Sequence, residues 1–121
     1  GGLHLNGVDQ YVQVALDVNP SVMPQMTWGA WINLSDNAPI RQVLSNDNSN
    51  FDRSIGIDFR DGISGQLTAF SGNGLISNGG VAPLNTWLFV AAVYDNASSS
   101  MRFYVDGNAV TKTTNFDTLI S

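Results

Sequence analysis

The stretch 85–107, NTWLFVAAVYDNASSSMRFYVDG, constrains the fold most, because it carries the pattern of consecutive antiparallel strands. Residues 87–94 and 101–105 are rich in β-branched and aromatic residues, and the short polar segment between them has the composition of a turn. Asp106-Gly107 supplies the positive φ values of a tight hairpin, so a further strand is expected over 108–113. The stretch therefore predicts three antiparallel strands in succession.

The alternation of apolar and polar residues predicts which faces of these strands are buried. Met101, Phe103 and Val105 alternate with polar residues, so the second strand has one apolar face. In 87–94 residues of both parities are apolar, and that strand is expected in the interior of a layered structure. The side chains expected between the layers include Trp28, Trp87, Phe89 and Phe103.

The rest of the chain contains further short runs of the same kind, separated by turn residues. Strands are expected over 2–5, 8–14, 25–33, 40–44, 53–60 and 66–70, and a loop over 71–80. The residues expected to point inward are Leu3 and Leu5, then Met26, Trp28, Ala30 and Ile32, then Ile55, Ile57 and Phe59. About nine short strands without helical periodicity predict an all-β fold, an antiparallel β-sandwich or jelly roll.

Composition excludes several classes of function. The 121 residues are expected to form one domain with a substantial core, and the absence of Glu among ten acidic residues argues against much helix. Five scattered cations and a net charge of −5 argue against nucleic acid as a partner. No apolar run is long enough for membrane insertion, and the lack of cysteine excludes disulfides and thiolate metal sites.

Enzymatic chemistry finds little support in the residues. A Ser-His-Asp arrangement needs a histidine base, and His4, near the chain start, is the only histidine. Glycoside hydrolysis uses two carboxylates, yet Asp58 is the only one in mid-strand, and Arg60 on the same face would keep its pKa low. We therefore expect the chain not to be an enzyme.

Calcium binding has a stronger basis. A hard cation takes oxygen ligands from carboxylates, amides and backbone carbonyls held in loops. The loop 45–52 offers such ligands in Asn46, Asp47 and Asp52, together with Asn48 and Asn50. The alternative interpretation is a solvated turn stabilised by its own Asn and Asp side chains.

Carbohydrate binding would combine an aromatic platform with planar polar groups, because a sugar ring has one face rich in C–H groups and hydroxyls at its rim. Trp31 and Tyr104 are the aromatic candidates that share a strand face with polar neighbours, although core packing is the alternative for any aromatic residue. The polar candidates are Asn50, Asp52, Arg53, Asp58 and Arg60.

Five segments in order resemble a laminin-G-like domain of the concanavalin-A-like jelly-roll superfamily, which also contains the pentraxins. They are LHLNGVDQYVQV (3–14), MTWGAWINL (26–34), QVLSNDNSNFDRSIGIDF (42–59), LNTWLFVAAVYD (84–95) and MRFYVDGNAV (101–110). The superfamily includes lectins, adhesion modules, structural domains and glycanases, so the resemblance implies the fold more than the function. It also implies a calcium ligand at Asp52, where pentraxins have one, and a structural ion site at Asp9.

Family members continue past the VDG strand to a closing strand that pairs with the first one. We therefore expect 1–121 to be a single, C-terminally truncated domain. Its open sheet edge is expected to be completed by a second chain or fragment, or its first strand to be displaced. The function expected is a non-catalytic, extracellular or cell-surface module that binds a glycan, with Ca²⁺ as a cofactor. The alternatives are a structural or protein-interaction module of a larger secreted protein and, least favoured, a fragment of a jelly-roll glycanase.

Overall fold

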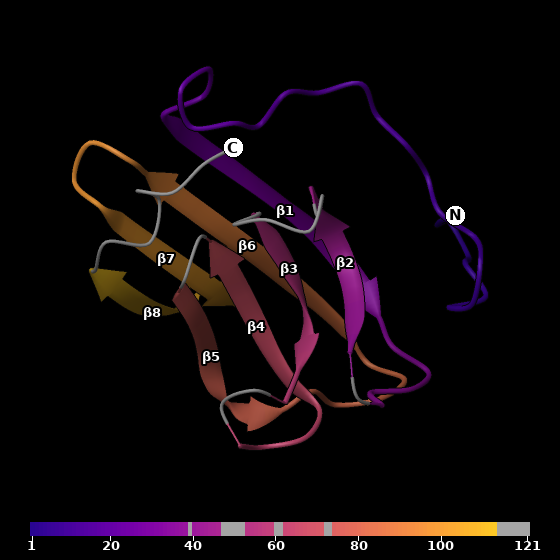
Figure 1. The fold of residues 1–121 in the computed structure, drawn as a ribbon. Coiled ribbons are helices and arrows are strands. Elements are labelled where there is room, and N and C mark those ends of the chain that lie inside the picture. Colours follow the sequence, from indigo (N-terminus) through magenta and orange to yellow (C-terminus); the bar gives the residue numbers. More distant parts are fainter. Residues whose placement is uncertain (39, 47–52, 60–61, 72–73, 114–121) are drawn as a thin grey trace.

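The chain folds into two antiparallel sheets packed face to face in a computed structural model that describes residues 1–38, 40–46, 53–59, 62–71 and 74–113 (Figure 1). The first sheet has the order β1-β6-β7-β8 and the second the order β2-β3-β4-β5. The strands of the first sheet are β1 (Gln25–Asn33), β6 (Trp87–Asp95), β7 (Ser100–Val105) and β8 (Asn108–Thr113). Those of the second are β2 (Arg41–Ser45), β3 (Ser54–Asp58), β4 (Gln66–Ser71) and β5 (Gly74–Val81). No helix occurs in the described residues.

The meander β6-β7-β8 confirms the prediction made from 85–107. Asp106 and Gly107 have φ values of 47° and 82°, as a tight hairpin requires. The backbone N–H of Phe89 donates a hydrogen bond to the Asp106 carboxylate (2.8 Å), and the N–H of Asp106 donates to the carbonyl oxygen of Phe89 (2.9 Å). The turn is therefore tied to the middle of the sheet by side chain and backbone together.

The core lies between the two sheets and follows the predicted alternation in most strands. Phe103 and Met101 on β7 are fully buried, as are Ile55 on β3 and Leu67 on β4. Tyr94 on β6 is also fully buried, and its hydroxyl lies 3.3 Å from the carbonyl oxygen of Ser54 and 3.2 Å from that of Phe70. Because both carbonyls belong to the second sheet, Tyr94 joins the two layers by polar contacts as well as by packing.

Three strands lie where the sequence predicts them. β1 has the predicted bounds, and its residues alternate between exposed and covered along its length. β4 extends the predicted strand 66–70 by one residue, and β2 is shifted by one residue from 40–44. Trp28 on β1 is half-buried, and its ring meets the Tyr94 ring edge-on at 6.2 Å between centroids.

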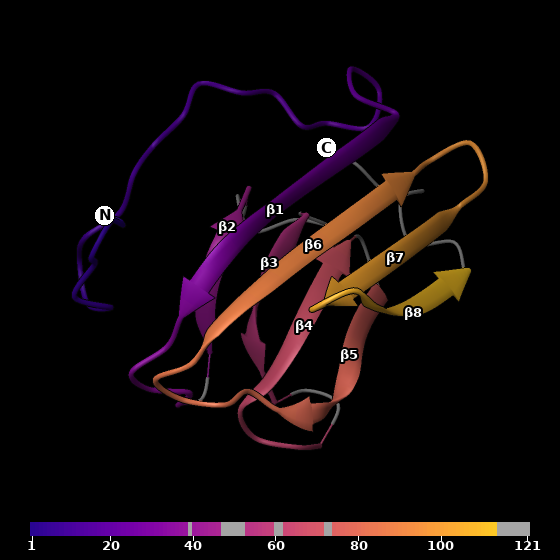
Figure 2. The ribbon, with the colours of Figure 1, turned by 180° about the vertical axis from the view of Figure 1, so that it is seen from behind.

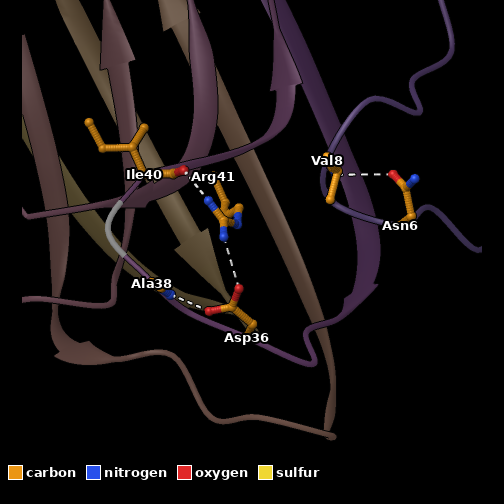
Figure 3. A network of polar contacts seen from close by, with 6 residues as sticks. All are labelled: Asn6, Val8, Asp36, Ala38, Ile40 and Arg41. Atoms are coloured by element: carbon orange, nitrogen blue, oxygen red, sulfur yellow. Dashed lines mark hydrogen bonds and ion pairs between the residues drawn. The ribbon is translucent and has the colours of Figure 1, made fainter.

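The strands predicted over 2–5 and 8–14 are absent: residues 1–17 form no strand and run outside the sandwich (Figures 1 and 2). Leu3 and Val8 are 71% and 87% exposed. The Asn6 carboxamide oxygen accepts hydrogen bonds from the backbone N–H groups of Val8, Asp9 and Gln10, the first of which Figure 3 shows. These local hydrogen bonds occupy backbone N–H groups that would otherwise pair with a neighbouring strand. A period-two pattern buries a face only when the strand finds a partner.

Further expectations are also wrong. Phe59, predicted to face inward, is 45% exposed, because it lies just beyond the end of β3 at Asp58, where its carbonyl oxygen accepts a hydrogen bond from the Gly62 N–H. Segment 71–80, predicted as a loop, contains most of β5, since backbone pairing with β4 needs no β-favouring side chains. Trp87 and Phe89, both predicted between the layers, are 58% and 37% exposed on the outer face of β6.

Candidate functional site

The outer face of the first sheet carries the candidate site. On β1 and β6 the side chains that point away from the core belong to odd-numbered residues, and on β7 they belong to even-numbered ones. Figure 2 looks onto this sheet, with β1 at its edge and β6 beside it. The face has two parts, an aromatic patch and a polar depression.

The aromatic patch consists of Trp31, Trp87 and Phe89. Trp31 on β1 lies opposite Phe89 on β6, and Trp87 lies opposite Asn33 in the same ladder. The rings of Trp31 and Phe89 are 5.6 Å apart between centroids and inclined at 54°. Trp31 is 66% exposed and Phe89 37% exposed, so the strands hold aromatic surface open to solvent. Large exposed aromatic groups on a rigid sheet are features of ligand-binding surfaces.

Gly29 lies beside the patch, and its lack of a side chain leaves room for the Phe89 ring. A Cβ atom at Gly29 would lie 3.1 Å from Cζ of Phe89 and 2.8 Å from the carbonyl oxygen of Val90. Ala91, the partner of Gly29 across the ladder, contributes only a methyl group. The Phe89 ring therefore extends over Gly29 and continues the aromatic patch along the sheet toward Ala91.

The polar depression lies at the opposite end of the same three strands, beside the turn between β6 and β7. Its volume is about 530 Å³. The side chains at its surface are those of Gln25, Thr27, Val93, Asp95, Ser98, Ser100 and Arg102. Met26 and Tyr94 also line it, and both residues are buried.

Asp95 gives the depression a fixed negative charge. Hydrogen-bond donors hold the pKa of this carboxyl below its ordinary value. The Ser98 hydroxyl has the largest effect, followed by the Gln25 side chain and the backbone N–H groups of Ser98 and Ala97. The N–H groups of Ala97 and Ser98 lie 3.1 and 3.3 Å from its Oδ1. Arg102, which is exposed on β7, supplies the opposite charge.

The structure separates the residues predicted to bind carbohydrate. Trp31 and Tyr104 share the outer face of the first sheet, where Tyr104 is half-buried opposite Ala91. Asp58, expected at the surface, is only 4% exposed and lies on the other sheet, opposite Gln66. Three further predicted residues, Asn50, Asp52 and Arg60, lie outside the described residues.

Arg53 was expected at the surface and is instead 2% exposed between the sheets. Its guanidinium carbon lies 4.8 Å from the centre of the Tyr94 ring, and its Nη1 donates a hydrogen bond to the carbonyl oxygen of Met23 (2.9 Å). The aromatic face and the carbonyl offset the loss of hydration of the buried cation. Arg53 therefore connects the sheets and does not reach the surface face described above.

The residues predicted as calcium ligands are also scattered. Asp9 lies in the exposed N-terminal turn, where its Oδ1 accepts a hydrogen bond from the Asn6 amide (2.6 Å). Asn46 is exposed after β2, and its backbone N–H donates to the carbonyl oxygen of Arg53 (3.0 Å). Asp47 and Asp52 lie outside the described residues, and among the described ones no three His, Cys, Asp or Glu side chains are grouped for a metal. Calcium binding stays a prediction.

Sequence reasoning missed Phe89 and Trp87 as exposed residues and missed the depression altogether. The register of the β6–β7 hairpin indicates the depression, because pairing Asp95 with Ser100 brings Arg102 beside Val93 on the same face. What the alternation of a strand does not reveal is which of two apolar faces meets the other sheet. In the described residues no helix is long and apolar enough to cross a membrane.

The two-sheet architecture and the comparison with known families both indicate a concanavalin-A-like β-sandwich. The laminin G family model described as concanavalin A-like lectin/glucanases superfamily matches residues 6–121. The chain therefore belongs to this superfamily, in its laminin-G-like group. Searches of the curated proteins and of the solved structures found no match.

Proposed function

We propose that the chain is a non-catalytic carbohydrate-binding module whose ligand lies on the outer face of the first sheet. The observation that carries the proposal is the aromatic patch, above all Trp31, 66% exposed on a paired strand. An exposed indole on a rigid strand offers a flat apolar surface for the C–H-rich face of a sugar without a large loss of side-chain entropy.

A binding role fits the charges on this face better than a hydrolytic one. Hydrolysis of a glycosidic bond uses two carboxyl groups on either side of the scissile bond. Among the described outward-facing residues of β1, β6 and β7, Asp95 is the only carboxylate. Its lowered pKa keeps it ionised at neutral pH, which suits a hydrogen-bond acceptor and not a general acid.

The proposal includes an extracellular or cell-surface location and a calcium ion at the loop 45–52. Both rest on the resemblance to laminin-G-like domains and on the oxygen-rich composition of that loop. Neither is needed for stacking on Trp31, so the two parts of the proposal can be tested separately.

A second candidate function, a protein-interaction module, is favoured by the N-terminal segment. Val8, Tyr11 and Val14 are each more than 70% exposed in a segment whose sequence alternates like a strand. Such a segment can add to the edge of a sheet in a partner protein, where backbone hydrogen bonds supply affinity and the alternating side chains supply specificity.

A glycan array probed with and without EDTA tests the first proposal. We expect binding by the wild-type chain, a loss of about tenfold or more with Trp31→Ala, and no change with Tyr11→Ala, which removes an equally exposed aromatic ring elsewhere. Sensitivity to EDTA would support the calcium site. Silence across the array, or equal binding by both variants, would count against the sugar site and favour the protein-interaction function.

A further inference from the structure

We infer that the ligand is an uncharged, linear glycan of about four or more sugar units, which lies along β1 and β6 from the aromatic patch to the polar depression. The inference rests on the proposed carbohydrate function and adds the length, charge and direction of the ligand. Three features support it: the register of the two strands, the surface between the two parts of the site, and the polar groups of the depression.

The register places both parts of the site on one straight path. Trp31 pairs with Phe89, Thr27 with Val93 and Gln25 with Asp95, all on the outer face. Trp31 and Thr27 are four residues apart on an antiparallel strand, which corresponds to about 14 Å. A pyranose unit built from bonds of about 1.5 Å advances a linear chain by about 5 Å. One ring stacked on Trp31 therefore leaves Thr27 to be reached by the third unit beyond it, so a tetramer is the shortest chain that spans both parts of the site.

The surface between the two parts has no bulky side chain of its own, and the tip of the Phe89 ring extends over it at Gly29. The pair between them is Gly29 and Ala91, which presents no side chain on β1 and a methyl group on β6. Tyr104, opposite Ala91 on β7, forms the flank of this path and is half-buried. A bulky side chain at Gly29 or Ala91 would have divided the face into two separate sites, and the sequence has the two smallest residues there.

The chemistry of the depression matches hydroxyl groups of an uncharged ligand. A sugar hydroxyl both donates and accepts hydrogen bonds, and the Gln25 amide and the hydroxyls of Thr27 and Ser100 do the same. Asp95 accepts and Arg102 donates, and their opposite charges leave the described lining without net charge. A sulfated or uronic-acid chain would meet the Asp95 carboxylate with only one cation to offset it, so charge complementarity favours a neutral glycan.

The test measures dissociation constants by titration calorimetry with the full chain. The probes are two neutral ladders, cello-oligosaccharides and chito-oligosaccharides from monomer to hexamer, and two anionic ladders, oligogalacturonates and heparin-derived oligosaccharides. We expect affinity for a neutral ladder to rise about tenfold or more between monomer and tetramer and to level off soon after. Thr27 and Arg102 both flank Val93, and the double variant Thr27→Ala/Arg102→Ala is expected to bring tetramer binding to within about twofold of monomer binding.

Controls separate this inference from the proposed function. Arg41→Ala, on the other sheet, should leave the whole ladder unchanged, and Trp31→Ala should weaken every member. If binding depends on Trp31 but is as tight for the monomer as for the tetramer, or does not respond to the double variant, the inference is overturned and the sugar function stands. Tighter binding of an anionic ladder also overturns it. If no ladder and no arrayed glycan binds, the proposed function itself fails.

Discussion

At the level of single residues, chemically similar side chains on one strand differ in burial because they lie on opposite faces. Trp28 and Trp31 are three residues apart on β1, and the first is half-buried against Tyr94 while the second is 66% exposed. Alternation along the strand assigns such residues to opposite faces. Whether a face is covered depends on the other layer, and the second sheet covers only the inner one.

Phe103 and Phe89 allow a matched test of this difference. Phe103 is fully buried between the sheets and Phe89 is 37% exposed on the outer face. Phe103→Ala should lower the free energy of unfolding by about 3–5 kcal/mol, because it removes buried surface and leaves a cavity. Phe89→Ala should lower it by about 1 kcal/mol. Urea denaturation of both variants provides the comparison, and equal losses would contradict the assignment of faces.

At the level of elements, the pairing of β2 with β3 depends on one glycine. Gly56 pairs with Gln42 next to an irregularity in the ladder between Gln42 and Leu44. A Cβ atom at Gly56 would overlap the carbonyl oxygen of Arg41 and lie 3.0 Å from the Gln42 side chain. The two strands therefore approach more closely here than any residue with a side chain would permit.

Gly56→Ala should destabilise the fold by about 2 kcal/mol or more, since a backbone carbonyl cannot move aside as a flexible side chain can. Gly80→Ala is the control, because nothing lies within 4 Å of a Cβ atom there. Thermal unfolding followed by circular dichroism measures both. If Gly56→Ala unfolds at the wild-type temperature, the close approach of β2 and β3 is wrong.

At the level of the whole molecule, the N-terminal segment contributes little to the sandwich. Residues 1–17 pair with no strand, whereas Val18 just beyond them is only 3% exposed and belongs to the core. The segment does approach the candidate site, because a Cβ atom at Gly2 would lie 3.5 Å from the Trp87 ring. Its main effect is expected on interactions, not on stability.

Deleting residues 1–16 should change the free energy of unfolding by less than about 1 kcal/mol, since it removes exposed side chains and no ladder. Deleting residues 1–20 removes Val18 as well and should cost about 2 kcal/mol more. Guanidinium denaturation of the two shortened chains measures the difference. A loss of several kcal/mol on the first deletion would mean that 2–5 and 8–14 do pair as strands, as their sequence pattern predicts.

Most of the architecture was predictable from the sequence because strand periodicity and turn chemistry are local. The hairpin at Asp106-Gly107, the bounds of β1 and the buried parity of Phe103 all follow from neighbouring residues. The family resemblance rests on five segments of the sequence and is confirmed over residues 6–121. By contrast, the sequence predicts a loop over 71–80 because the glycines and asparagine there do not favour strands, and pairing with β4 is what makes β5 a strand.

An all-β sandwich follows from the sequence alone, because alternation, turns and the absence of helical periodicity are properties of neighbouring residues; the laminin-G type is implied by the five segments that resemble that family. The packed structure was needed to show which apolar faces are covered, that Arg53 is buried while Trp31, Trp87 and Phe89 are exposed, and that residues 3–14 lie outside the sheets. The physical reason is that burial depends on the partner across the interface. That partner is set by the packing of distant strands and not by the neighbours of a residue in the chain.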